Sequence, residues 1–152
     1  MKMKITENCW IDILWPIKSE LIEDNALNNN SLVFKFIYKN LSILFTGDIE
    51  EIAEKQIIEK YKNTDRLKAN ILKVAHHGSK SSTIQSFIDL VQPQIALIGV
   101  GKNNNFGHPN DGVLQRLNNK NVNVYRTDEK GEILIYLKNN NINIKSIVRD
   151  NQ

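Results

Sequence analysis

The side chains in this sequence that are best suited to chemistry are its three histidines and one aspartate. Each follows an apolar segment of the kind that forms buried strands, and they are Asp48, His76, His77 and His108. In α/β sheets, ligands bind at the carboxyl ends of the strands. Imidazole and carboxylate groups are common ligands of divalent metal ions. We therefore expect these loops to converge on one site and ask whether that site holds a metal.

Asp48 has two plausible roles. It precedes a helical pattern and stands three residues before Glu51, which is typical of a helix N-cap with a capping-box partner. Taken alone, the capping role is favoured, because Asp is a leading cap residue. The functional role is a carboxylate held at the end of a central strand by a turn at Gly47, where it could ligate one metal ion or bridge two. Its two oxygens allow both roles together.

His76 and His77 are adjacent, at the end of an expected strand over residues 71–75. Neighbouring residues of a strand point to opposite faces. We therefore expect one of them to be a direct ligand and the other to contact substrate or to support the first. The spacing does not decide which is which. Gly78 would let the backbone turn or approach a ligand closely.

Polar residues follow the histidine pair. Ser79, Lys80 and Ser81 could present hydroxyl, ammonium and backbone N–H groups to an anionic substrate. The alternative for the serines is helix capping, which we favour for each serine separately. His108 lies on a loop between a glycine and a proline and is a candidate proton donor, substrate contact or ligand. Its alternative is an ordinary surface histidine.

The elements needed to position these residues can be read from hydrophobic periodicity. A strand over residues 10–15 carries Asp12 at its centre, which suggests an edge or a surface face. Helices are expected over residues 49–61, 83–91 and 110–119, and the other strands over residues 32–38, 41–45, 71–75, 95–100, 122–125, 132–137 and 142–148, with a hairpin turn at 129–131. This order predicts an α/β (α+β) fold with a mixed sheet and helices on one face.

Length and composition set broad limits on the protein class. A chain of 152 residues predicts a single domain over residues 1–152. Hydrophobic content of 41% and charged content of 24% are ordinary for a globular protein, and the single cysteine excludes an internal disulfide. The net charge of +3 permits contact with phosphates without demanding it. No apolar stretch reaches the roughly 20 residues of a membrane helix, so we expect this chain to be cytoplasmic.

Four motifs together resemble the ComEC-type competence proteins, in order and in spacing. They are Leu-Phe-Thr-Gly-Asp-Ile-Glu at 44–50, Leu-Lys-Val-Ala-His-His-Gly-Ser at 72–79, Gly-His-Pro at 107–109 and Tyr-Arg-Thr-Asp at 125–128. The resemblance extends over about residues 10–137. It implies the C-terminal half of a metallo-β-lactamase-like domain, which is an αββα sandwich with a two-metal hydrolytic site. The implied activity is phosphodiester cleavage, as a nuclease acting on a DNA strand during uptake.

The resemblance also implies roles for individual residues. Asp48 aligns with the aspartate that bridges the metal ions, either His76 or His77 with a late histidine ligand, and His108 with a histidine that faces the substrate. Asp48 and His108 are thus the candidate catalytic residues, and the implied cofactor is a divalent metal, zinc or manganese. Such ions activate a water and stabilise the phosphorus centre. In a longer competence protein, this domain would be membrane-associated.

The sequence departs from the family pattern in one respect. The family's His-x-His-x-Asp-His loop is not here, so the chain offers about two ligands, against the three or four of a zinc site. We expect the chain to be incomplete alone, not to retain metal by itself, and to need either a homodimer or a polypeptide that supplies the N-terminal half. The alternatives are an inactive remnant, an anion- or nucleic-acid-binding module, and an esterase that acts on small phosphocholine-type esters.

Overall fold

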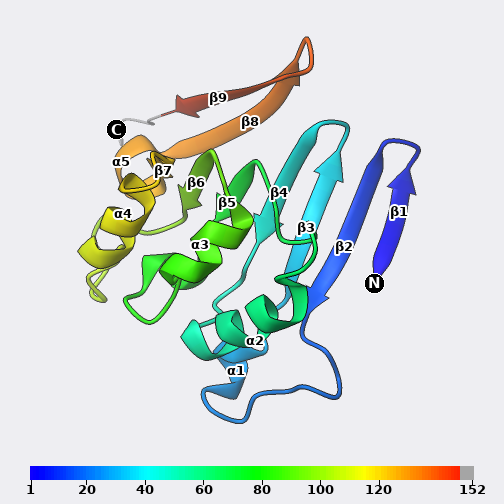
Figure 1. The fold of residues 1–152 in the computed structure, drawn as a ribbon. Coiled ribbons are helices and arrows are strands. Elements are labelled where there is room, and N and C mark those ends of the chain that lie inside the picture. Colours follow the sequence, from blue (N-terminus) through cyan, green and yellow to red (C-terminus); the bar gives the residue numbers. More distant parts are fainter. Residues whose placement is uncertain (148–152) are drawn as a thin grey trace.

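The computed structural model describes residues 1–147, which form a seven-stranded sheet, a separate two-stranded sheet and several helices (Figure 1). The strands are β1 (Lys2–Thr6), β2 (Cys9–Trp15), β3 (Val33–Tyr38), β4 (Leu41–Phe45), β5 (Ile71–Lys73), β6 (Ile95–Ile98), β7 (Asn123–Arg126), β8 (Glu132–Lys138) and β9 (Asn141–Ile147). The helices are α1 (Ala26–Asn29), α2 (Glu51–Tyr61), the short 3₁₀ helix η1 (Ala75–Gly78), α3 (Gln85–Val91), α4 (Asp111–Asn118) and α5 (Thr127–Lys130).

The large sheet has an antiparallel part and a parallel part. Its strands follow the chain order from β1 to β7; β1 to β4 pair antiparallel, and β4 to β7 pair parallel. Helices α2, α3 and α4 each connect two neighbouring parallel strands, as such connections require. The carboxyl ends of the four parallel strands consequently lie along one edge of the sheet, and the loops that carry the candidate residues start there.

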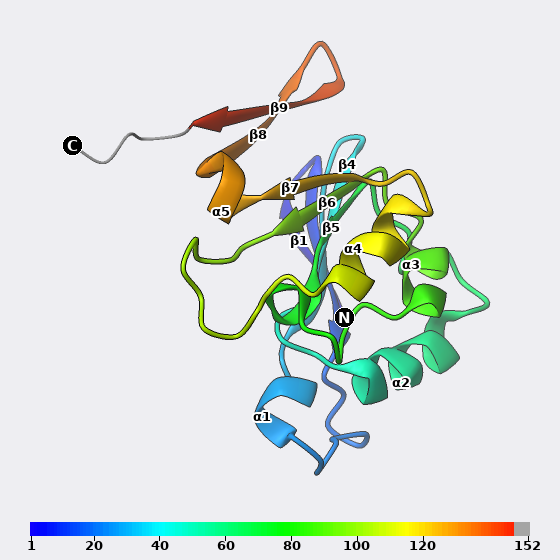
Figure 2. The ribbon, with the colours of Figure 1, turned by 90° about the vertical axis from the view of Figure 1, so that its left-hand side faces the viewer.

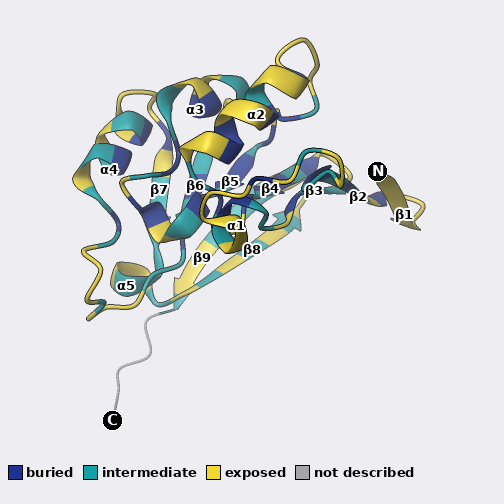
Figure 3. Cartoon of the chain, turned by 90° about the horizontal axis from the view of Figure 1, so that it is seen from below, coloured by how far each residue is buried: buried dark blue, intermediate teal, exposed yellow. Residues whose placement is uncertain are grey.

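Helices α2, α3 and α4 lie on one face of the large sheet and the β8–β9 hairpin lies on the other, which Figure 3 shows from below. The larger core lies between the sheet and the helices. It contains fully buried side chains from both layers, including Leu14, Trp15, Leu44, Ile57 and Phe87. Figure 2 shows the hairpin as a separate ribbon above the sheet. The predicted mixed sheet with helices on one face is confirmed.

The second face of the sheet is also apolar, but it is only partly covered. Leu41, Ile43 and Ile71 form a small buried cluster there, and side chains of β8 and β9 pack against it. Phe34 and Phe36 lie on the same face, because they pair with Phe45 and Ile43 of β4. They are only partly buried.

Several predicted elements differ from the observed ones. Neither β1 nor the short helix α1 was predicted, and residues 129–131, expected to form a hairpin turn, belong to α5 and its C-terminal end. The reason is that β7 and β8 belong to different sheets, so no hairpin joins them. The strand predicted over 142–148 is observed as β9, and residue 148 itself lies outside the described residues. Within residues 1–147, no helix is long and apolar enough to span a membrane.

The prediction that Asp12 lies at an edge or a surface was wrong. Strand β1 pairs with β2 and takes the edge position, and Asp12 is 1% exposed. The guanidinium of Arg66 donates two hydrogen bonds to its carboxylate, at 2.6 and 3.1 Å. Burial of this carboxylate is tolerated because the charge is paired and hydrogen-bonded.

Candidate functional site

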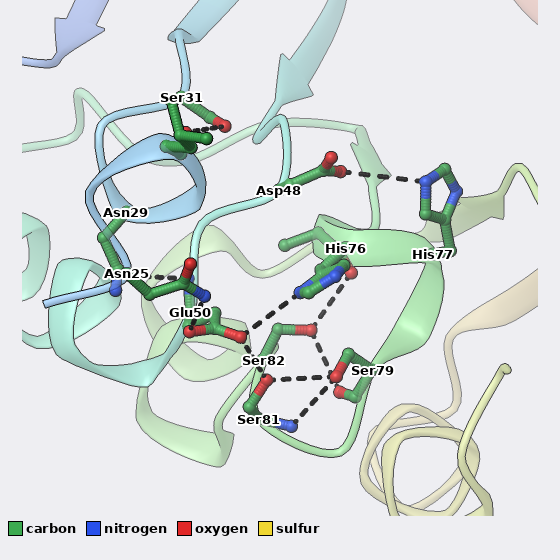
Figure 4. A network of polar contacts seen from close by, with 12 residues as sticks. Asn25, Asn29, Ser31, Asp48, Glu50, His76, His77, Ser79, Ser81 and Ser82 are labelled. Carbon is green, nitrogen blue, oxygen red and sulfur yellow. Dashed lines mark hydrogen bonds and ion pairs between the residues drawn. The ribbon is translucent and has the colours of Figure 1, made fainter. Parts of the chain in front are cut away.

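The loops after β4, β5 and β6 bring the four candidate residues to the same edge of the sheet. Asp48 follows β4, His76 and His77 follow β5, and His108 lies in the loop between β6 and α4. The His76 ring centroid is 6.4 Å from that of His77 and 5.8 Å from that of His108. Figure 4 shows the carboxylate of Asp48 facing His77. The expected convergence of an aspartate and an imidazole is observed.

Asp48 does not cap the helix that follows it, so the capping role favoured from sequence was wrong. The N-cap of α2 is Glu50, and Asp48 lies in the preceding turn. The first helical N–H group, that of Glu51, donates instead to the carbonyl of Ser81 at 2.8 Å. The half-exposed carboxylate of Asp48 is thereby left free to face the site.

Gly47 allows the turn that aims Asp48. Its φ is +53°, a left-handed conformation that L residues with a side chain rarely adopt. A Cβ atom here would also lie 2.6 Å from the Cβ of Ser31. The turn is fixed further by the N–H of His76, which donates to the Gly47 carbonyl at 3.1 Å and so ties the aspartate loop to the histidine loop.

The two histidines lie in a turn and not in a strand. Strand β5 ends at Lys73, and His76 and His77 belong to η1 with φ angles of +46° and +54°. The alternation of side chains along a strand therefore does not apply to His76 and His77, because both have left-handed backbones. Such conformations cost about 1–3 kcal/mol each and concentrate at functional sites.

His77 is oriented by a backbone carbonyl. Its Nδ1 lies 2.5 Å from the oxygen of Gly99, and because a carbonyl only accepts, Nδ1 carries the proton. In the neutral ring, Nε2 then keeps its lone pair, and this atom lies 3.9 Å from Oδ1 of Asp48. A partner that fixes the far nitrogen in this way is typical of histidines that ligate metal ions.

The environment of the His76 ring differs from that of His77. Its Nδ1 is buried and lies 3.4 Å from Oε1 of Glu50 without meeting hydrogen-bond geometry, and no other described residue bonds it. Glu50 in turn accepts hydrogen bonds from Asn25 at 2.9 Å and from Ser81 at 2.8 Å. Burial works to raise the pKa of Glu50, but these hydrogen bonds and His76 outweigh it and lower the pKa. Glu50 is thus kept as a carboxylate beside His76.

The serines after the histidines hold the loop together. The hydroxyls of Ser79 and Ser81 lie 3.0 Å apart, and Ser82 donates to the carbonyls of Ala75 and Ser79. They do not cap α3 as we had favoured. Instead, the carboxylate of Glu54 accepts the N–H groups at the start of that helix. Lys80 is exposed, and the predicted substrate contacts of Ser79, Lys80 and Ser81 stay predictions.

His108 borders a hollow of about 370 Å³, whose lining residues are His77, Gly99, Val100, Gly101, Asn104, Phe106, His108 and Thr127. Partial burial lowers the pKa of His108, and the neighbouring His76 and His77 lower it further. The neutral imidazole is therefore favoured, which suits a group that accepts or relays a proton. The predicted catalytic role of His108 stays a prediction.

Two basic side chains affect the charge of this region in different ways. The Lys73 ammonium lies near Asp48 and donates to the carbonyl of Val74 at 2.8 Å; burial lowers its pKa, and Asp48 partly opposes this. Arg126 pairs with Asp128 at 2.6 Å and with Glu129 at 2.9 Å. Its charge is therefore already engaged.

The donor set fits part of a metal site. Bonds from zinc to nitrogen or oxygen ligands are about 2.0–2.2 Å long, so one ion can contact both Asp48 and His77 across their separation. Among residues 1–147, no three His, Cys, Asp or Glu side chains gather closely enough to hold an ion. A zinc site has three or four ligands, so further ligands would have to come from elsewhere.

Sequence reasoning missed several residues of this region. Glu50 was given no role at the site, although its position two residues after Asp48 was a usable signal. Phe106 is an exposed aromatic in the loop before His108, a signal that was also visible in the sequence. Gly99 acts through its carbonyl oxygen, and no side-chain pattern could have identified it.

Comparison with known proteins gives no matching family model. The chain is, however, 43% identical over 123 residues to ComE operon protein 3 of Bacillus subtilis, a match that covers 81% of this chain and 16% of that protein. It is 29% identical over 122 residues to Competence protein ComA of Neisseria gonorrhoeae, covering 80% of this chain and 17% of that protein. The chain is thus related to one segment of the competence proteins. Recombination protein 2 of Haemophilus influenzae is 33% identical over 110 residues, covering 72% of this chain and 13% of that protein.

The chain spans about one sixth of the length of ComE operon protein 3 and of Competence protein ComA. The similarity supports the competence-protein resemblance that the four motifs indicated.

Proposed function

We propose that this chain supplies one part of a metal-dependent hydrolase site that cleaves phosphodiester bonds of DNA during uptake by competence. The observation that carries the proposal is the pairing of Asp48 with His77, because the carboxylate is not used for capping and faces a lone pair on Nε2 at 3.9 Å. The similarity to competence proteins supports DNA as the substrate.

In this proposal, Asp48 and His77 hold a divalent ion, zinc or manganese, together with ligands from another polypeptide segment. When bound, the metal would supply an activated water and charge stabilisation. The residues of this chain orient that centre: the Gly99 carbonyl sets the His77 ring, and Gly47 sets the Asp48 turn. His108, kept neutral by its surroundings, accepts or returns a proton on the substrate side.

The partner segment would cover the partly exposed apolar face of the large sheet. Phe34 and Phe36 lie there beyond the small cluster under the hairpin, and apolar surface of this kind favours association. We propose a polypeptide that carries the His-x-His-x-Asp-His loop as the occupant, completing a metallo-β-lactamase-like sandwich. A homodimer is the alternative occupant.

The test mixes the full chain with such a polypeptide and follows cleavage of single-stranded DNA in the presence of manganese or zinc. We expect cleavage by the mixture to exceed that by either part, and Asp48→Asn to remove it. Asp65→Asn is the matched control, because Asp65 is a highly exposed carboxylate that pairs with Lys68. No gain on mixing, or equal effects of the two variants, would count against the proposal.

A second function is binding without hydrolysis, as an anion- or nucleic-acid-binding module. This function is favoured because Asp48 and His77 supply two metal ligands, fewer than the three or four of a zinc site. The same mixtures separate the two functions: DNA binding that persists without cleavage at any metal concentration supports the binding module.

A further inference from the structure

An exposed aromatic side chain lies at the rim of the hollow beside His77. Phe106 is 81% exposed, and its ring lies 5.9 Å from that of His108 with an angle of 18° between the planes. One face of the Phe106 ring is therefore stacked on the imidazole, and the high exposure leaves the other face open. We propose that this open face stacks on a nucleobase of a single nucleic-acid strand.

The loop that carries Phe106 is held in place by its own hydrogen bonds. The amide of Asn104 donates to the carbonyls of Gly101 and His108, at 3.1 and 2.8 Å. The oxygen of the same side chain accepts from the N–H groups of Phe106 and His108, at 3.3 and 3.0 Å. Thr127 fixes the start of the loop through the N–H of Val100, at 2.7 Å. The aromatic ring is thus presented by an ordered loop, which lowers the entropic cost of binding.

The stacking surface of Phe106 lies beside the residues that we propose as metal ligands, because Phe106 and His77 line the same hollow. His77 lines the same hollow and faces Asp48 on its other side. A base stacked on Phe106 would place its own backbone phosphates near this pair. The volume of about 370 Å³ lies within the range of small-ligand sites.

Stacking on an aromatic ring selects for unpaired bases. Every base offers a π face, so such contacts tolerate any sequence. In a duplex, both faces of a base are covered by its neighbours, and the ring cannot reach them without unstacking. This inference rests on the proposed function in taking nucleic acid as the substrate, and it adds a preference for single strands and a residue that provides it.

The test measures binding by fluorescence anisotropy to the full chain. The probes are a labelled oligothymidylate, a sugar–phosphate oligomer of equal length without bases, and a duplex. We expect the oligothymidylate to bind about 5- to 150-fold more tightly than the abasic oligomer, the gain that stacking of one base gives. Phe106→Ala should bind the oligothymidylate and the abasic oligomer with the same affinity, and Phe106→Trp should keep the preference for the oligothymidylate.

Lys102 provides a matched control, because it is exposed on the same loop. Lys102→Ala should weaken binding of the base-containing and abasic strands by the same factor, since a lysine that contacts phosphate does not depend on the base. Equal affinity of the wild-type chain for both strands, no binding of either strand, or an unchanged ratio in Phe106→Ala would overturn the proposal. Loss of association with a protein partner in Phe106→Ala, without any base preference, would overturn it as well.

Failure of the proposed function has a separate signature. If base-dependent binding disappears in Phe106→Ala but the completed mixture never cleaves DNA, the stacking surface stands and the hydrolase proposal fails. If the mixture cleaves base-containing and abasic strands equally well and Phe106→Ala changes nothing, the hydrolase proposal stands and the stacking proposal fails.

Discussion

Glu54 is a carboxyl group buried in the core behind the histidine turn. It is 0% exposed and accepts hydrogen bonds from the N–H groups of Thr83 at 2.5 Å and Ile84 at 2.8 Å. Burial raises its pKa to about 7, although the two N–H groups and the nearby Arg116 oppose the rise. Glu54 therefore connects α2 to the start of α3 and titrates near neutral pH.

This titration predicts a pH-dependent stability. The folded chain holds a proton on Glu54 that the unfolded chain releases near pH 4.5, so the contribution of Glu54 to stability is fully present below that pH and is lost as the pH rises through about 7. Between pH 5 and pH 8, the free energy of unfolding of the wild type should fall by about 2–3 kcal/mol more than that of Glu54→Gln, which cannot titrate. Urea unfolding at the two pH values measures both changes. A difference between the two proteins that stays constant with pH would contradict the assignment.

At the residue scale, sequence reasoning identified the types of residue and misjudged their surroundings. Asp48 and the histidine pair were found because polar groups after apolar strands are visible in the sequence. Asp48 was expected to cap a helix because the helix start was placed two residues too early, at residue 49 and not at Glu51. The burial of Glu54 could not be predicted, since it depends on the packing of α3 against α2.

At the scale of elements, the turn after β4 is the feature most sensitive to substitution. Gly47→Ala would force a side chain into a left-handed backbone and against Ser31 at 2.6 Å. We expect the free energy of unfolding to fall by about 1–3 kcal/mol. Thermal or urea unfolding measures the change.

Gly101→Ala is the matched control for this turn. Within residues 1–147, no atom beyond its two chain neighbours lies within 4 Å of the position that its Cβ would occupy, and its backbone is not left-handed. The substitution should change stability by no more than about 0.5 kcal/mol. Similar losses in both variants would show that Gly47 has no special conformational role.

Elements with strong local patterns were predicted well. The β3–β4 hairpin and helices α2, α3 and α4 have clear periodicity, and each was found within a few residues of its observed bounds. Strand β1 alternates polar and apolar residues, a strand signal that was overlooked, and none of its residues is buried. The histidine turn was taken for a strand end because the residues before it are apolar, although β5 stops at Lys73.

At the scale of the whole molecule, the β8–β9 hairpin decides how the second face of the sheet is covered. The two strands of the hairpin were predicted from sequence, but the position of the hairpin was not, because its contacts join residues far apart in the chain. Ile135, Leu137 and Ile142 pack against the cluster around Ile43. The hairpin thus forms a two-stranded layer over part of this face.

Two neighbouring positions of β8 test this layer. Ile135 faces the large sheet, whereas Leu134 points away and is 45% exposed. Ile135→Asp would bury a charge without a partner, so we expect it to detach the hairpin and to lower the free energy of unfolding by about 1–3 kcal/mol. Leu134→Asp should cost less than about 0.5 kcal/mol, as for an exposed site. Urea unfolding gives the two energies, and amide hydrogen exchange shows whether β8 and β9 lose protection in Ile135→Asp alone. Equal energies and equal exchange in the two variants would mean that the hairpin does not pack on the sheet, and the partner that we propose would then have to cover the whole of that face.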